Sequence, residues 1–101
     1  MTSYDCSARL AHVIKVLGDI SDSLACTYTG EAKSDLRELI TTVRGYSKDD
    51  ARWEAVAVTL EDALNHLYGS ELMEGGHHLV SLRRALSDNG LPGISGATPR
   101  P

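Results

Sequence analysis

Residues 53–67 of this 101-residue chain read WEAVAVTLEDALNHL. Apolar residues return here at steps of three and four, which places them on one side of an α-helix. The spacing is typical of a helical seam that neighbouring helices bury. We expect this helix to follow an N-cap at Ser47 and to end at Gly69. Its predicted inward residues are Trp53, Val56, Ala57, Leu60, Ala63, Leu64 and Leu67.

Two segments before this helix show the same period. The first is predicted to run from about Tyr4 to Thr27, after an N-cap at Ser3 and continuing through Gly18. The second is predicted to run from about Glu31 to Arg44, with Gly45 as a left-handed residue at its end. Their predicted inward residues are Cys6, Leu10, Val13, Ile14, Leu17, Ile20 and Leu24 in the first segment, and Ala32, Leu36, Leu39, Ile40 and Val43 in the second.

A last periodic segment runs from about Glu71 to Asp88, with Ser70 as its expected N-cap. The pair Gly75-Gly76 allows two interpretations. Either the helix starts after the glycines, or it continues and the glycines let another backbone approach closely. Leu72 and Leu79 are seven residues apart and stay in phase across the pair, which favours a continuous helix. The predicted inward residues are Leu72, Leu79, Leu82 and Leu86.

Four amphipathic segments with short connections predict an all-α protein, an antiparallel four-helix bundle. The alternative is a helical protomer that completes its core by dimerising. The chain is 42% hydrophobic and 24% charged, as is ordinary for a globular domain. We therefore expect one helical domain over residues 1–90. Residues 91–101 are rich in Pro, Gly, Ser and Thr, and we expect them to form a flexible C-terminal tail.

The charge pattern disfavours direct nucleic-acid binding. Ten Lys and Arg residues against fourteen Asp and Glu leave a net charge of −4. Residues 53–82 contain no Lys or Arg, whereas phosphate binding usually needs a basic stripe. An anionic membrane surface is disfavoured for the same reason. A protein partner with a basic surface would suit this stretch. Its acidic residues are Glu54, Glu61, Asp62, Glu71 and Glu74.

The sequence predicts no cofactor and no metal. Glu74 and His77 have the Glu-x-x-His spacing of di-iron bundles, but a second copy is missing and both project away from the core. The i,i+4 pairs Asp62–His66 and Glu74–His78 offer two ligands each, too few for a firm site. A Gly-x-Ser-x-Gly elbow and a phosphate-binding glycine loop are also missing. We therefore expect that the protein is not an enzyme.

The sequence also predicts the cellular compartment and the state of the two cysteines. The chain shows neither a membrane-length apolar run nor a basic region followed by an apolar stretch at Met1, so we expect a cytoplasmic protein. Cys6 and Cys26 would lie about 30 Å apart along one helix, too far for an intrachain disulfide. We expect Cys6 to be a buried thiol and Cys26 a free one near a helix end.

Some apolar residues project outside the predicted core, and they are the remaining indication of a function. Met73 and Val80 lie beside the inward face of the last helix, with Gly76 between them. Val58 projects onto the polar face of the preceding helix. Scattered exposed aliphatic side chains are normal in monomers, so ordinary packing on the flank of the bundle is the alternative. A second stripe on this helix, flexible at Met73 and shallow at Gly76, favours a docking surface for another protein or for a second copy. The predicted partner-binding residues are Val58, Glu61, Asp62, Met73, Gly76, Val80 and Arg84.

Three functional hypotheses are compatible with these patterns. The first is a small regulatory protein that inhibits a larger partner, such as a transcription factor, by masking one of its surfaces (an antiactivator). The second is an immunity protein that neutralises a toxin or bacteriocin. The third is a metal-binding bundle or a small enzyme.

Overall fold

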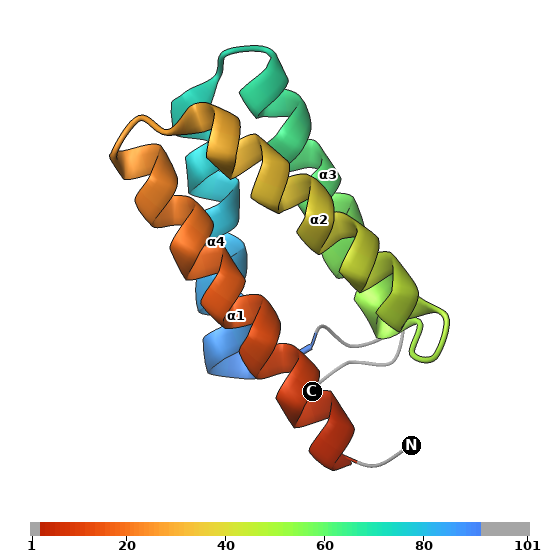
Figure 1. Ribbon diagram of the computed structural model, residues 1–101. Helices are drawn as coiled ribbons and strands as arrows, with labels where there is room; N and C mark the ends of the chain where they lie inside the picture. The colour runs from red at the N-terminus through yellow and green to blue at the C-terminus, as the bar shows by residue number, and fades with distance from the viewer. Residues whose placement is uncertain (1–2, 92–101) are drawn as a thin grey trace, which may run out of the picture.

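The computed structural model describes residues 3–91, with side chains described from residue 7 onward. This part of the chain folds into four α-helices joined by short connections. They are α1 (Ser3–Ala25), α2 (Thr29–Ser47), α3 (Arg52–Tyr68) and α4 (Leu72–Asn89). Short connections reverse the chain between consecutive helices (Figure 1). Helices α1 and α3 each pack against both α2 and α4. The fold is the antiparallel four-helix bundle that the periodicity predicts.

The interior is an aliphatic core built around one tryptophan, Trp53, which is 1% exposed. All the described inward positions are buried or partly buried except Leu72, whose predicted burial is wrong: its side chain is 40% exposed. Leu72 is the first residue of α4, at the end of the bundle, where the adjoining chain is a loop rather than a packed helix. The fully buried side chains include Val13, Leu17, Ile20, Leu36, Val43, Val56, Leu60, Leu67, Leu79 and Leu86.

Helix α1 is continuous through Gly18, as expected. Cys26 directly follows it as an exposed free thiol, which confirms the prediction for that residue. The expectations for the side chains of Ser3 and Cys6 lie outside the described side chains. So does the tail beyond residue 91, whereas Leu91 itself packs partly buried against the core.

The junction between α2 and α3 differs from the prediction. Gly45 lies within α2 and is not left-handed, and Ser47 is the last residue of α2 rather than an N-cap. Its Oγ donates a hydrogen bond of 2.7 Å to the carbonyl of Arg44. The extra turn of α2 is held by Tyr46, whose ring centroid lies 5.0 Å from that of Trp53. Aromatic packing thus outweighs the helix-ending tendency of glycine.

Asp50, rather than Ser47, accepts a hydrogen bond from a free backbone N–H group at the start of α3. Its Oδ1 accepts a hydrogen bond of 3.0 Å from the backbone N–H of Arg52, the first residue of α3. The Arg52 guanidinium also donates to this carboxylate at 2.7 Å. These hydrogen bonds, above all those from the Arg52 side chain, lower the pKa of Asp50.

Two helix ends carry a left-handed residue that is not glycine. Thr27 and Ser70 both have φ near +65°. After α1, the N–H of Tyr28 donates to the carbonyl of Ser23 at 2.8 Å, and the N–H of Thr27 donates to Leu24 at 3.0 Å. The same pattern follows α3, so both ends are Schellman motifs. Ser70 is therefore the terminator of α3, and its predicted role as the N-cap of α4 is wrong.

We expect Thr27→Gly to stabilise the protein. A β-branched side chain is strained at positive φ, whereas glycine adopts this conformation freely, so the free energy of unfolding should rise by about 1 kcal/mol. Urea denaturation of both proteins measures the difference. Thr29→Gly, which alters a helical residue two positions on, is the control and should lower stability. Equal losses in both variants would contradict the strain at Thr27.

Gly75 sets the distance between α3 and α4. It is buried, and a Cβ added there would lie 2.7 Å from Cδ2 of Leu67 and 3.1 Å from the carbonyl oxygen of Ala63. Both atoms belong to α3, so a side chain at position 75 would force Leu67 or the backbone of α3 to shift. Gly76 is different, because its added Cβ would meet only Cδ1 of Leu24 on α1, at 3.8 Å. The helix is continuous through the pair, as the phase of the leucines predicts.

The two glycines should therefore respond oppositely to alanine. Gly75→Ala overpacks the contact with α3 and should lower the free energy of unfolding by about 1–3 kcal/mol. Gly76→Ala adds helix propensity without a clash and should raise it by up to about 1 kcal/mol. Thermal melts of both variants followed by circular dichroism test this. Stabilisation by Gly75→Ala would show that α3 and α4 are not in this close contact.

Candidate protein-binding surface

Helix α4 presents two unlike faces. Leu79 and Leu86 are buried on the inner face together with Gly75. Met73 is 87% exposed and Val80 is 46% exposed. Because the buried leucines already seal the core, the fold does not require these two side chains for packing. Exposed apolar groups that do not serve the fold mark a candidate contact surface.

The predicted residues of α4 form one continuous surface. We call Met73, Gly76, Val80 and Arg84 the α4 stripe. It borders α1: Gly76 lies near Leu24, as noted above, and Ile14 shares a shallow hollow of about 230 Å³ with Val80 and Arg84. The outer side of the stripe borders an open depression of about 460 Å³, lined by His77, Val80, Ser81, Arg84, Ala85, Asp88 and Asn89.

The predicted residues of α3 do not join this stripe. Val58 and Asp62 are exposed on α3, which packs against α2 and α4 but lies diagonally across the bundle from α1. Glu61 instead faces α2, where it binds Arg44. The structure therefore divides the seven predicted residues into two groups. The four residues of α4 lie on the side that borders α1, whereas the three residues of α3 lie elsewhere, with Glu61 next to α2.

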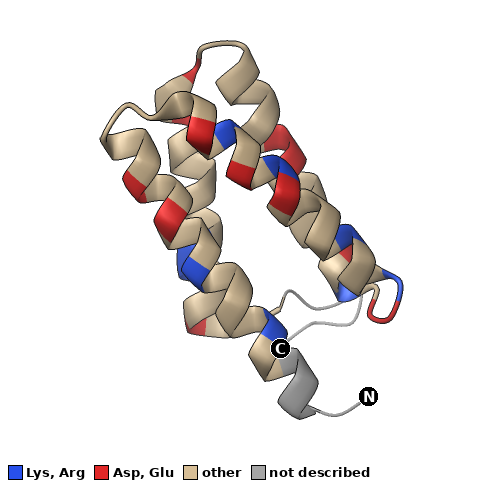
Figure 2. Ribbon diagram, in the orientation of Figure 1, with Lys and Arg blue, Asp and Glu red and all other residues tan. Residues whose placement is uncertain are grey.

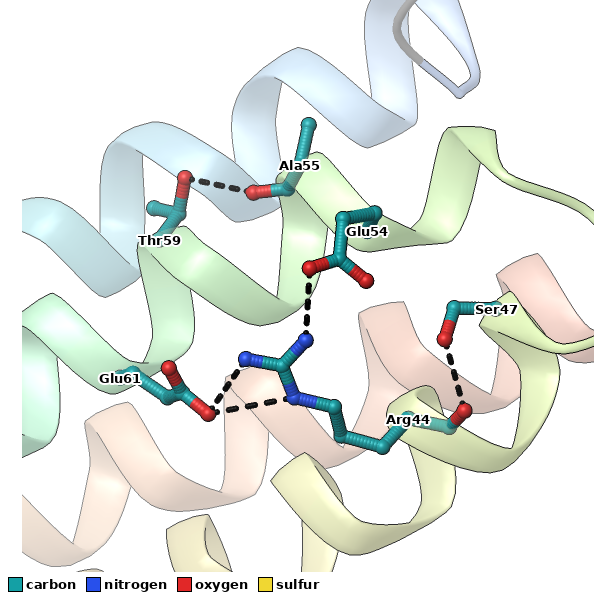
Figure 3. A network of polar contacts seen from close by, with 6 residues as sticks. All are labelled: Arg44, Ser47, Glu54, Ala55, Thr59 and Glu61. Atoms are coloured by element: carbon teal, nitrogen blue, oxygen red, sulfur yellow. Dashed lines mark hydrogen bonds and ion pairs between the residues drawn. The ribbon is translucent and has the colours of Figure 1, made fainter.

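Arg44 bridges two carboxylates of α3 (Figure 3). Its Nη2 donates to Oε2 of Glu61 at 2.7 Å, and its Nη1 donates to Oε2 of Glu54 at 2.8 Å. These hydrogen bonds, the one to Glu61 first, raise the pKa of Arg44. Because the guanidinium is partly exposed to solvent, these ion pairs add little to the free energy of unfolding. Their main effect is to link α2 to α3 at this point.

The acidic stretch 53–82 is therefore less acidic in the fold than in the sequence. Arg44 on α2 pairs with both Glu54 and Glu61 and offsets one of their two negative charges. Figure 2 shows the distribution of acidic and basic residues over the bundle. Glu71 is bound by His66. Asp62 and Glu74 form no ion pair with another residue between 7 and 91.

His66 contacts residues at both sides of the loop between α3 and α4. Its Nδ1 lies 2.6 Å from Oε1 of Glu71, and its ring stacks on that of His78 with centroids 4.9 Å apart. Glu74 and His77 are exposed, as expected. Within the described residues, no three potential donors are close enough together to hold a metal ion.

Sequence reasoning missed an apolar groove between α3 and α4. It encloses about 300 Å³, and the signal for it was small residues at facing positions, Ala55 and Ala85. Its other lining residues are Val56, Thr59, Leu82, Leu86, Asn89 and Gly90.

The comparisons with known proteins leave the surface to be interpreted on its own geometry. No protein-family model, curated protein or solved structure matches this chain. Across residues 3–91, none of the helices has both the length and the apolar character of a membrane span.

Two adjacent residues of α4 test the division into faces. Leu79→Asp removes a buried leucine and buries a charge, which should cost more than about 4 kcal/mol and unfold the protein. Val80→Asp places its charge on exposed surface and should change the free energy of unfolding by less than about 1 kcal/mol. Thermal melts of both variants provide the measurement. Unfolding of Val80→Asp would assign the α4 stripe to the core.

Proposed function

We propose that this protein is a small cytoplasmic regulator that works by binding another protein through the α4 stripe. In this proposal it is an inhibitor, or antiactivator, that masks a surface of a larger partner such as a transcription factor. The observation that carries the proposal is the 87% exposure of Met73 beside Val80, on a helix whose opposite face already completes the core. Exposed, flexible methionine is typical of surfaces that adapt to a partner.

The charges around the stripe indicate what the partner offers. Arg84 lies at one end of the stripe, and Glu74 is next to Met73 at the other. A partner would place an apolar side chain against Met73 and Val80, an acidic group near Arg84 and a basic group near Glu74. Apolar contacts in the centre with charges at the rim are the usual arrangement of a protein–protein interface.

Direct DNA recognition receives little support from the same residues. A recognition helix normally presents basic or amide side chains at its amino-terminal end. Helix α4 presents Glu74 in its first turn, and the guanidinium of Arg52 at the start of α3 is bound to the carboxylate of Asp50. The Glu74 carboxylate would repel phosphate, so we favour action on a protein rather than on DNA.

A toxin-neutralising immunity protein is the second candidate. The net charge of −4 and the exposed Asp62 and Glu74 favour it, because many toxins that act on nucleic acid are basic. The two candidates differ in the partner that they capture: a regulatory protein in the first case and a basic toxin in the second.

Affinity capture with matched variants tests the proposed surface. Val80→Asp should abolish capture of the partner from native lysate, since a carboxylate would be buried in an apolar contact. Val58→Asp is the matched control, because Val58 is 45% exposed, receives the same substitution and lies on α3. It should capture the partner as the parent does. Mass spectrometry of the captured protein separates regulator from immunity protein.

Thermal melts establish that both variants are folded before capture is compared. Loss of capture by Val58→Asp with retention by Val80→Asp would move the site to α3. Retention by both would contradict the proposal that either exposed valine mediates binding.

A further inference from the structure

The apolar groove between α3 and α4 begins at the point where the chain leaves α4. Asn89, the last residue of α4, and Gly90, its C-cap, belong to the lining of the groove, and so does Leu82, eight residues before Gly90. The groove therefore extends about 12 Å back along α4 from Gly90. The chain that follows Gly90 starts at one end of an apolar groove.

The walls of the groove favour an aliphatic side chain. Val56 and Leu86 are buried beneath it, Leu82 is partly buried, and no charged residue belongs to its described lining. The hydroxyl of Thr59 already donates to the carbonyl of Ala55 at 3.1 Å (Figure 3), so it needs no further partner. An apolar cavity of about 150 Å³ can hold a benzene ring, so the groove of about 300 Å³ has room for a branched aliphatic side chain.

The backbone turns back toward the bundle at the end of α4. Gly90 has φ +74° and ψ −159°, a combination that essentially only glycine adopts, and its N–H donates to the carbonyl of Leu86 at 2.9 Å. After this turn Leu91 packs partly buried against the core. The next residue is Pro92, which favours an extended conformation at Leu91. The chain thus stays against the bundle after the helix has ended.

The residues that follow contain one large aliphatic side chain. It is Ile94, and the rest of residues 92–101 are Pro, Gly, Ser, Ala, Thr and Arg. Ile94 is four residues beyond Gly90, so an extended chain places it up to about 14 Å from Gly90. This reach covers the length of the groove.

We propose that the C-terminal segment folds back on the bundle and places the side chain of Ile94 in the groove, between Ala55 of α3 and Ala85 of α4. The two small residues provide the space for it, and burial of its apolar surface stabilises the contact. The segment then closes the groove in place of the free tail that its composition predicts. Because Val80 and Arg84 do not line the groove, the inference is independent of binding at the α4 stripe.

Methyl NMR of the 101-residue chain tests the docking directly. The sequence has four isoleucines, so the signal of the Ile94 δ1 methyl group can be assigned individually. We expect nuclear Overhauser effects from this methyl group to those of Leu82 and Ala85, with the same intensity at low and high protein concentration. The absence of these effects overturns the proposal. So does their appearance between differently labelled copies, which would make a second copy the occupant.

A pair of substitutions tests the contact by stability. Ile94→Ser should lower the midpoint of thermal unfolding by about 4–8 °C, the shift expected when a domain of this size loses one partly buried aliphatic contact. Ala97→Ser, in the same segment, is the control and should shift the midpoint by less than about 2 °C. Ala85→Glu fills the groove from the exposed side of α4 with a charged side chain.

The double variant shows whether the two positions are coupled. If Ile94 occupies the groove, Ala85→Glu displaces it, so Ile94→Ser should have no further effect in that background. A full effect of Ile94→Ser in both backgrounds overturns the proposal, because the isoleucine would then pack elsewhere. An Ile94→Ser variant that melts like the parent overturns it as well.

Discussion

The contact of Gly75 with Leu67 and Ala63 determines which side of α4 faces solvent. At this point a backbone without a side chain meets the body of another helix, so α4 cannot rotate without separating from α3. With Gly75 fixed inward, helical periodicity places Leu79 and Leu86 in the core. The same rotation leaves Met73 and Val80 outside. The candidate surface is thus a geometric consequence of one close approach between two helices.

Ion pairs between helices change the charge that the surface of the bundle presents to a partner. The sequence has an unbroken acidic stretch, yet Arg44 reaches two of its carboxylates from a different helix. What remains without an ion pair to a residue between 7 and 91 is Asp62 on α3 and Glu74 on α4, two carboxylates on different helices rather than a uniformly acidic face. Recognition by such a surface depends on orientation as well as on net charge.

The helical seams could be predicted from the sequence because burial follows a period that is visible along the chain. The helix ends could not, since they depend on tertiary contacts. Tyr46 extends α2 past Gly45 only because Trp53 lies against it, and Thr27 terminates α1 in a conformation that its side chain disfavours. The α4 half of the candidate site was predictable from the same period. The placement of Glu61 was not, because its partner Arg44 lies seventeen residues away in sequence.

The packing of Tyr46 on Trp53 also gives the molecule an optical reporter. Trp53 is the single tryptophan of the chain, and it is buried with a tyrosine ring 5.0 Å away. Its emission therefore reports the junction of α2 and α3, at a site enclosed by core side chains, while the α4 stripe contains no tryptophan or tyrosine. Indole fluorescence consequently records unfolding of the bundle, and it does so without an aromatic reporter inside the α4 stripe itself.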